Sequence, residues 1–72
     1  MNAIGHKIKK HREQQDLTQE ELAARCNVVG WDISRSTLAK IEAKVRRITD
    51  IEIIQIAKAL RVPISELFDS EL

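Results

Sequence analysis

The sequence is short of several residue types, and each shortage excludes a class of protein. Cys26 is the only cysteine among 72 residues, so an internal disulfide is impossible and the spacing of a four-ligand zinc site is absent. Trp31 and Phe68 are the only aromatic residues, whereas single-stranded nucleic-acid binders stack bases on aromatic rings. No run approaches the roughly 18 apolar residues of a membrane span. A lone cysteine in apolar surroundings fits a core position in a cytoplasmic protein.

Glycine and proline are also scarce, which favours helices. Only Gly5, Gly30 and Pro63 interrupt the chain. The length predicts one domain, residues 1–72, whose small core makes a large active-site cleft unexpected. The charges are unevenly distributed: residues 1–50 carry ten Lys or Arg against seven Asp or Glu, and residues 51–72 carry two against four. The cations therefore gather in the first two-thirds of the chain, and the C-terminal end is acidic.

Capping signals indicate where the helices begin. Thr18 with Glu21 is a capping box, in which hydroxyl and carboxylate each bind a backbone N–H of the first turn, and Thr49 with Glu52 is a second one. Apolar residues recur at helical spacing, so we predict an all-α, compact five-helix domain. The expected helices cover residues 3–15, 18–26 with a possible extension to 29, 34–43, 49–60 and a short last helix at 63–68 that Pro63 opens.

Trp31 lies in the turn between the second and third expected helices, and two roles are open for it. It can plug the core beneath this turn, with Ile51 and Ile54 as natural partners, or it can contact DNA or another protein. The core role is the more common one for a single tryptophan. If Trp31 does not cover them, Ile51 and Ile54 are free for a dimer contact.

The second and third helices, joined by a turn, form an arrangement that can read a DNA major groove. The third helix begins at Ser34, a good N-cap, and directs Leu38 and Ile41 inward. Its outward positions carry short polar and cationic side chains. An α-helix fits the major groove, where Arg or Lys can bind guanine O6 and N7. Such a surface on a helix is more often merely solvated, so this pattern alone indicates DNA only weakly.

A set of residues spread over nearly the whole chain carries a family resemblance: Ile8, Arg12, the run Leu17-Thr18-Gln19-Glu20-Glu21-Leu22-Ala23, Ser34-Arg35-Ser36-Thr37, Ile41-Glu42, Ile56-Ala57-Lys58-Ala59-Leu60 and Glu66-Leu67-Phe68. Through these residues the chain resembles the helix-turn-helix domain of the phage repressor and Cro family, also called the xenobiotic-response-element family. Two departures stand out: the turn before Ser34 is longer than the family's usual turn, and residues 43–45 replace the family's glycine after the recognition helix.

This resemblance implies roles for individual residues. Arg35, Ser36 and Lys40 would face the base edges of double-stranded DNA. Arg12 and Glu42 match an ion pair that in relatives ties the first helix to the end of the recognition helix. The other matched or neighbouring polar residues would contact the DNA backbone: Gln19, Ser34, Thr37, Lys44, Arg46 and Arg47.

The sequence therefore predicts a transcription regulator, acting as a repressor or autoregulator, that binds a palindromic operator as a homodimer. One such domain contacts few base pairs, and two domains on adjacent half-sites supply affinity and specificity. Phage-type repressors, restriction–modification controllers and antitoxin-type autoregulators are all open. The dimer contact should use apolar residues outside the recognition face: Ile64, Leu67, Phe68 and Leu72.

An alternative is a protein-interaction module on the same fold, either an adaptor or an antitoxin-like domain that binds a partner. The near-neutral net charge and the acidic, apolar C-terminal end permit it. An enzyme is not expected, because Ser36 has no evident histidine base and no glycine-rich phosphate loop is present. No cofactor is indicated. His6 and His11 are five residues apart, so they do not share a helix face, and no metal site is expected.

Overall fold

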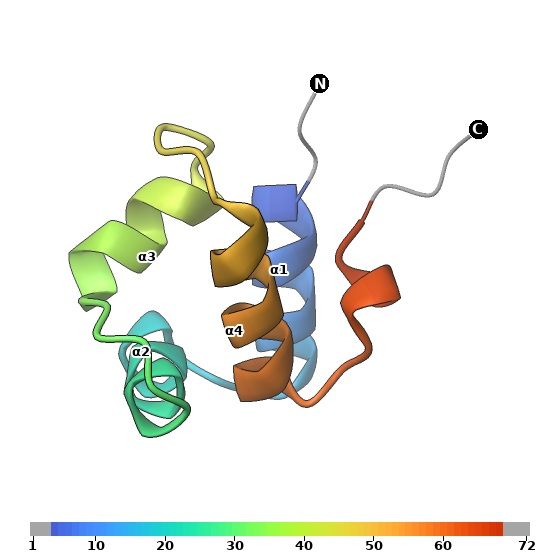
Figure 1. Ribbon diagram of the computed structural model, residues 1–72. Helices are drawn as coiled ribbons and strands as arrows, with labels where there is room; N and C mark the ends of the chain where they lie inside the picture. Colours follow the sequence, from blue (N-terminus) through green and yellow to red (C-terminus); the bar gives the residue numbers. More distant parts are fainter. Residues whose placement is uncertain (1–3, 69–72) are drawn as a thin grey trace.

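The computed structural model describes residues 4–68 and contains four α-helices followed by a single 3₁₀ turn (Figure 1). The expectation of five helices is therefore wrong in its last member: within residues 63–68 only Ile64–Glu66 form a 3₁₀ turn. Pro63 is extended, with φ −63° and ψ 146°, and its side chain offers no cap, so no longer helix begins there. The elements are α1 (Ile4–Gln14), α2 (Gln19–Val28), α3 (Arg35–Glu42), α4 (Asp50–Leu60) and η1 (Ile64–Glu66).

Local capping chemistry explains where the helices start. Both predicted capping boxes are present, Thr18 with Glu21 at α2 and Thr49 with Glu52 at α4, each with both of its hydrogen bonds. Ser34 caps α3 by accepting a hydrogen bond from the backbone N–H of Thr37. Each box satisfies backbone donors that the first turn would otherwise leave without a partner.

A residue in the left-handed conformation follows each α-helix, and in three of the four cases it is not a glycine. Asp16, Lys44 and Arg61 have φ values of 57°, 65° and 60°, and Gly30 has 103°. Lys44 donates its N–H to the carbonyl of Ile41, and Val45 donates to Lys40, which is the Schellman pattern. A non-glycine residue in this region is strained by about 1 kcal/mol or more, which the rest of the fold must offset.

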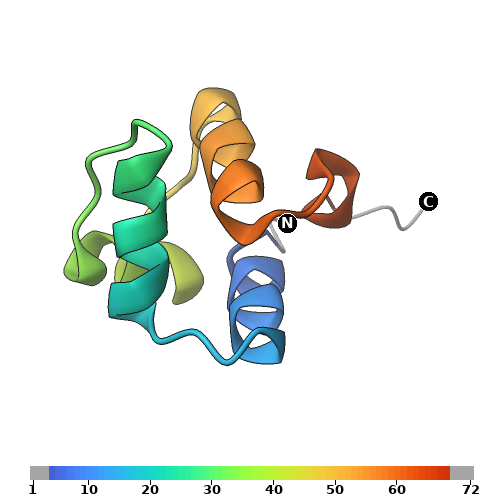
Figure 2. The same ribbon diagram turned by 90° about the horizontal axis from the view of Figure 1, so that it is seen from below.

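The helices enclose one core, to which all four α-helices contribute. α1 and α4 lie side by side, with α2 and α3 to one side and η1 to the other (Figures 1 and 2). Gly5 lets α1 approach α3 closely, because a Cβ there would collide with the carbonyl oxygen of Ile41. The fully buried large side chains are Ile8, Leu22, Cys26, Leu38, Ile41, Ile56, Leu60 and Leu67.

The last of these, Leu67, corrects one sequence expectation. It was assigned to the dimer contact, but its exposed fraction is 0 %, because the chain turns back after α4 and inserts Leu67 into the core. Trp31 is half-buried against the core and leaves Ile51 and Ile54 exposed, at 72 % and 45 %, so they are not its buried partners. Leu72 lies outside the described residues.

Candidate functional site

The outward side of α3 is the surface on which the predicted base-reading residues gather. Arg35, Ser36 and Lys40 are all exposed, while Leu38 and Ile41 on the opposite side are buried. Within residues 4–68, no carboxylate forms an ion pair with Arg35 or Lys40. Their charges are thus available to a ligand, and the buried side of the helix holds them in place.

The first turn of α3 is held by a cluster of hydroxyl groups. The Ser34 hydroxyl accepts from the Thr37 N–H at 3.2 Å, lies 3.1 Å from Thr37 Oγ1 and lies 3.2 Å from Ser36 Oγ. Ser34 and Thr37, both predicted to contact the DNA backbone, therefore also form the cap. Their small side chains leave room at this end of the helix for a close approach.

The start of α2 lies beside the start of α3. A surface depression between them is lined by both Gln19 and Arg35, together with Arg12, Thr18 and Glu20. One predicted backbone-contacting residue and one predicted base-contacting residue thus line a single surface. A phosphate near Gln19 would also meet the positive end of the α2 dipole.

Arg12 and Glu42 form a buried, bidentate ion pair beneath this surface. Arg12 Nε lies 2.8 Å from Glu42 Oε2, and Nη2 lies 3.1 Å from Oε1, with both residues less than 9 % exposed. The hydrogen bond to Glu42 raises the pKa of Arg12 above its usual value, although burial acts in the opposite direction. The guanidinium also donates to the carbonyl of Leu17 at 2.6 Å. This pair ties α1, the α1–α2 connection and the end of α3 together.

Gln19 takes part in the same network. Its amide nitrogen donates to Glu42 Oε1 at 3.0 Å, so the side chain predicted to bind phosphate also has a structural partner. Its second amide hydrogen and the backbone N–H groups of Gln19 and Glu20, which the capping box does not use, remain able to donate to a ligand. The network therefore couples the start of α2 to the end of α3.

The cations of the α3–α4 connector differ in how free they are. Arg46 makes a bidentate ion pair with Glu52, at 3.0 and 2.9 Å, which lowers the pKa of Glu52 and raises that of Arg46. Lys44 and Arg47 are exposed and have no carboxylate partner within the described part of the chain. The structure thus gives Arg46 a role in holding the connector on α4 and leaves Lys44 and Arg47 as the free cations.

Sequence reasoning missed the residue that shapes the long turn before α3. The Asn27 amide nitrogen lies within hydrogen-bond distance of three carbonyl oxygens, those of Ala23 at 2.8 Å, Trp31 at 3.2 Å and Ile33 at 3.1 Å. Ile33 directly precedes the cap of α3, so Asn27 helps to set where the recognition helix begins. An asparagine near a helix end, three residues before Gly30, was the available signal.

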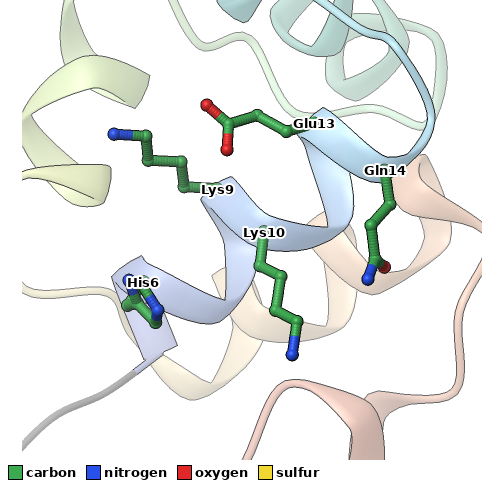
Figure 3. Close-up of a pocket in the computed structure, with 5 residues that line it drawn as sticks. All are labelled: His6, Lys9, Lys10, Glu13 and Gln14. Atoms are coloured by element: carbon green, nitrogen blue, oxygen red, sulfur yellow. The ribbon is translucent and has the colours of Figure 1, made fainter.

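Other chemistries find little support in the described residues. A shallow hollow on α1 is lined by His6, Lys9, Lys10, Glu13 and Gln14, all from one helix (Figure 3). Burial raises the pKa of the Cys26 thiol to about 11, so the thiol stays protonated and unreactive. Residues 4–68 contain no group of three His, Cys, Asp or Glu side chains placed to hold a metal, and no helix among them is long and apolar enough to cross a membrane.

Comparison with known proteins gives a consistent picture. A family model described as helix-turn-helix matches residues 8–67. The crystal structure of the restriction-modification controller protein C.AhdI from Aeromonas hydrophila superposes with a TM-score of 0.79 at 28% identity, covering 90% of this chain and 91% of that one. The clp gene regulator ClgR from C. glutamicum gives a TM-score of 0.80 at 18% identity, over 92% and 79% of the two chains, and shares the fold. No curated protein sequence gives a significant match.

Proposed function

Since this chain belongs to the Cro/C1-type helix-turn-helix family and is a DNA-binding transcription regulator, we propose that it recognises a palindromic operator as a twofold homodimer. The observation that carries the proposal is the outward surface of α3. Arg35, Ser36 and Lys40 are exposed there on a helix that is capped, buried on its other side and tied to α1 by Arg12 and Glu42.

In this proposal the three exposed α3 residues read base edges in the major groove. Gln19, Ser34 and Thr37 hold phosphates at the starts of the two helices, where backbone N–H groups and helix dipoles favour anions. Lys44 and Arg47 contact the backbone from the connector, and Arg46 contributes mainly by holding the connector in shape. A regulator acts where the DNA is, so we place the protein in the cytoplasm.

Dimer formation supplies a second α3 helix, which binds the second half-site of the operator. On α4 and around η1, the exposed large apolar residues are Ile51, Ile54, Ile64 and Phe68. This surface differs from the sequence expectation by the loss of Leu67 to the core. Ile51 and Ile54, which the sequence offered for the contact if Trp31 left them uncovered, are exposed. Pairing through this surface leaves both recognition surfaces free. The likeness to C.AhdI favours the restriction–modification controllers among the regulator classes considered.

Selection of bound sites from a random double-stranded DNA pool tests the proposal. We expect a palindrome whose half-sites lie about 34–36 Å apart, bound by two chains per duplex in sedimentation. A lone half-site bound by one chain would contradict the dimer. If no sequence were enriched at low salt, specific DNA recognition would be wrong and a partner-binding module would be favoured.

A further inference from the structure

The outward face of α4 changes from apolar to basic along its length. Ile51 and Ile54 are exposed at its start, and Lys58 and Arg61 are exposed at its end. The spacings of three, four and three residues place all four on one stripe of the helix. No other described element covers this stripe, since Ile51 remains 72 % exposed.

The basic end of the stripe continues onto α2 and forms a surface depression. We call it the basic depression; it is lined by Arg25, Val28, Val29, Lys58, Ala59 and Arg61. Arg25 is fixed there by hydrogen bonds to the Ala59 carbonyl at 3.3 Å and to Gln15 Oε1 at 3.2 Å, neither of which neutralises its charge. Val28 is 86 % exposed beside these cations.

The cations of the basic depression have no acidic partner within residues 4–68. None of the four ion pairs found there includes Arg25, Lys58 or Arg61. A ligand that fits must carry negative charge for the cations and an apolar group for Val28. A phosphate alone supplies only the charge, whereas an acidic peptide segment with an apolar residue supplies both.

The C-terminal end of the chain has this composition in a matching order. Ile64 and Phe68 are exposed apolar residues, at 38 % and 42 %, and the acidic residues Asp69 and Glu71 follow, with Leu72 at the end. The segment therefore changes from apolar to acidic and ends on an apolar residue. The α4 stripe changes from apolar to basic and ends near Val28.

The described chain after α4, up to Phe68, runs away from the basic depression of its own copy. Gln15 Nε2 binds the Leu60 carbonyl, so α4 ends beside the end of α1. The chain then runs back along α1: His11 lies 3.8 Å from Glu66, and Lys7 Nζ donates to the Phe68 carbonyl at 2.8 Å. Phe68 thus lies beside Lys7, which is about eight helical residues, or roughly 12 Å, from Gln15 at the end of α1. Residues 69–72 span at most about 14 Å even when fully extended. To reach the basic depression of their own copy, they would have to reverse the direction of the chain and extend almost completely.

We propose that in the homodimer residues 69–72 of each copy bind the basic depression of the other copy, with the two α4 helices antiparallel. This inference rests on the dimer proposed above. A twofold axis perpendicular to α4 brings the start of one α4 beside the end of the other, and η1 lies beside α4 on the side away from α2 (Figure 2). A parallel arrangement would instead bring Asp69 and Glu71 to the acidic first turn of α4, which carries Asp50.

Mixing two charge-reversed variants tests the exchange between copies. One variant carries Lys58→Glu and Arg61→Glu, and the other carries Asp69→Lys and Glu71→Lys. Each alone places like charges together at both ends of the dimer, so we expect its dimer dissociation constant in sedimentation equilibrium at low salt to rise about tenfold. Their equimolar mixture restores opposite charges at both contacts only if the segments cross, and it should form a heterodimer about as stable as the unchanged homodimer.

A charge reversal away from the basic depression controls for the change in net charge. Lys9→Glu, on the outer side of α1 (Figure 3), changes the net charge as Arg61→Glu does and should leave dimerisation unchanged. The variant with Asp69 and Glu71 reversed alters no described residue, so its fold serves as a reference by circular dichroism. Weakened homodimers without rescue on mixing would overturn the crossed contact, as would dimers that no reversal affects. If the unchanged protein formed no dimer in solution or on its operator, the proposed function itself would fail.

Discussion

Arg12 Nε lies 2.8 Å from Glu42 Oε2, although the two residues are thirty positions apart, and this contact joins the first helix to the end of the recognition helix. Both side chains are at most 10 % exposed. Removing Glu42 leaves the buried guanidinium without its carboxylate partner, although the Leu17 carbonyl remains, and it also removes the acceptor of the Gln19 amide. Glu42→Ala should therefore lower the free energy of unfolding by about 3–5 kcal/mol in urea titration.

Glu13→Ala is the matched control, since Glu13 lies 3.9 Å from the same guanidinium but is 59 % exposed. Its removal should cost no more than about 1 kcal/mol. A double-mutant cycle over Arg12 and Glu42 that showed no coupling would remove this pair from the account of stability.

The left-handed conformation of Lys44 allows stability and DNA affinity to be separated. Lys44→Gly relieves a φ of 65° and should stabilise the fold by roughly 0.5–1 kcal/mol, because glycine adopts this region without Cβ strain. The same change removes a free cation, so the slope of log affinity against log salt should fall by about one unit. Lys44→Ala keeps the strain and should show only the loss of slope. Equal stabilities of the two variants would contradict the strain argument.

The ion pair of Arg46 and Glu52 makes part of the stability depend on pH. Hydrogen bonding to Arg46 lowers the pKa of Glu52 below its ordinary value of 4.5, so the folded state favours the carboxylate. This contribution is complete above that ordinary value and is lost as the pH falls through the lowered one. The pair is partly exposed, so we expect Arg46→Ala to cost less than about 1 kcal/mol at pH 7 and still less in acid.

Chemical denaturation of Arg46→Ala and of the unchanged protein at several pH values measures this difference. Arg47→Ala serves as the control because Arg47 is exposed and has no carboxylate partner within residues 4–68, so its effect on stability should be small at every pH. An Arg46→Ala effect that grew as the pH fell would have the wrong sign for this ion pair.

The parts of the fold that depend on neighbouring residues were predictable from the sequence. The capping boxes at Thr18 and Thr49 each lie within four residues, so their hydrogen bonds can be inferred without knowing the tertiary structure. The ends expected at residues 15, 43 and 60 lie within one residue of the observed ones. The left-handed conformation of Asp16, Lys44 and Arg61 after these ends was not predictable, because none of the three is a glycine.

The errors concern burial and pairing that only the tertiary structure decides. The apolar pattern shows that Leu67 must be covered, but it does not say whether its own core or a second copy covers it. Similarly, Arg46 looks like Lys44 and Arg47 in the connector, and only the fold brings Glu52 to it. The charges on α4 and at the C-terminal end are visible in the sequence. Only the direction of the chain after Leu60 indicates that they could pair between two copies.

The central claim is that exposed residues of α3 read the operator bases, and an Arg35→Ala variant tests it most directly. Its affinity should be measured by gel shift against the selected operator and against a series with one base pair changed at a time, with Arg47→Ala as the arginine control. We predict that Arg35→Ala loses about 1–3 kcal/mol of discrimination at one or two positions per half-site, whereas Arg47→Ala weakens all sequences alike. If Arg35→Ala also weakened every sequence equally, Arg35 would contact only the DNA backbone, and the proposed recognition surface would be wrong.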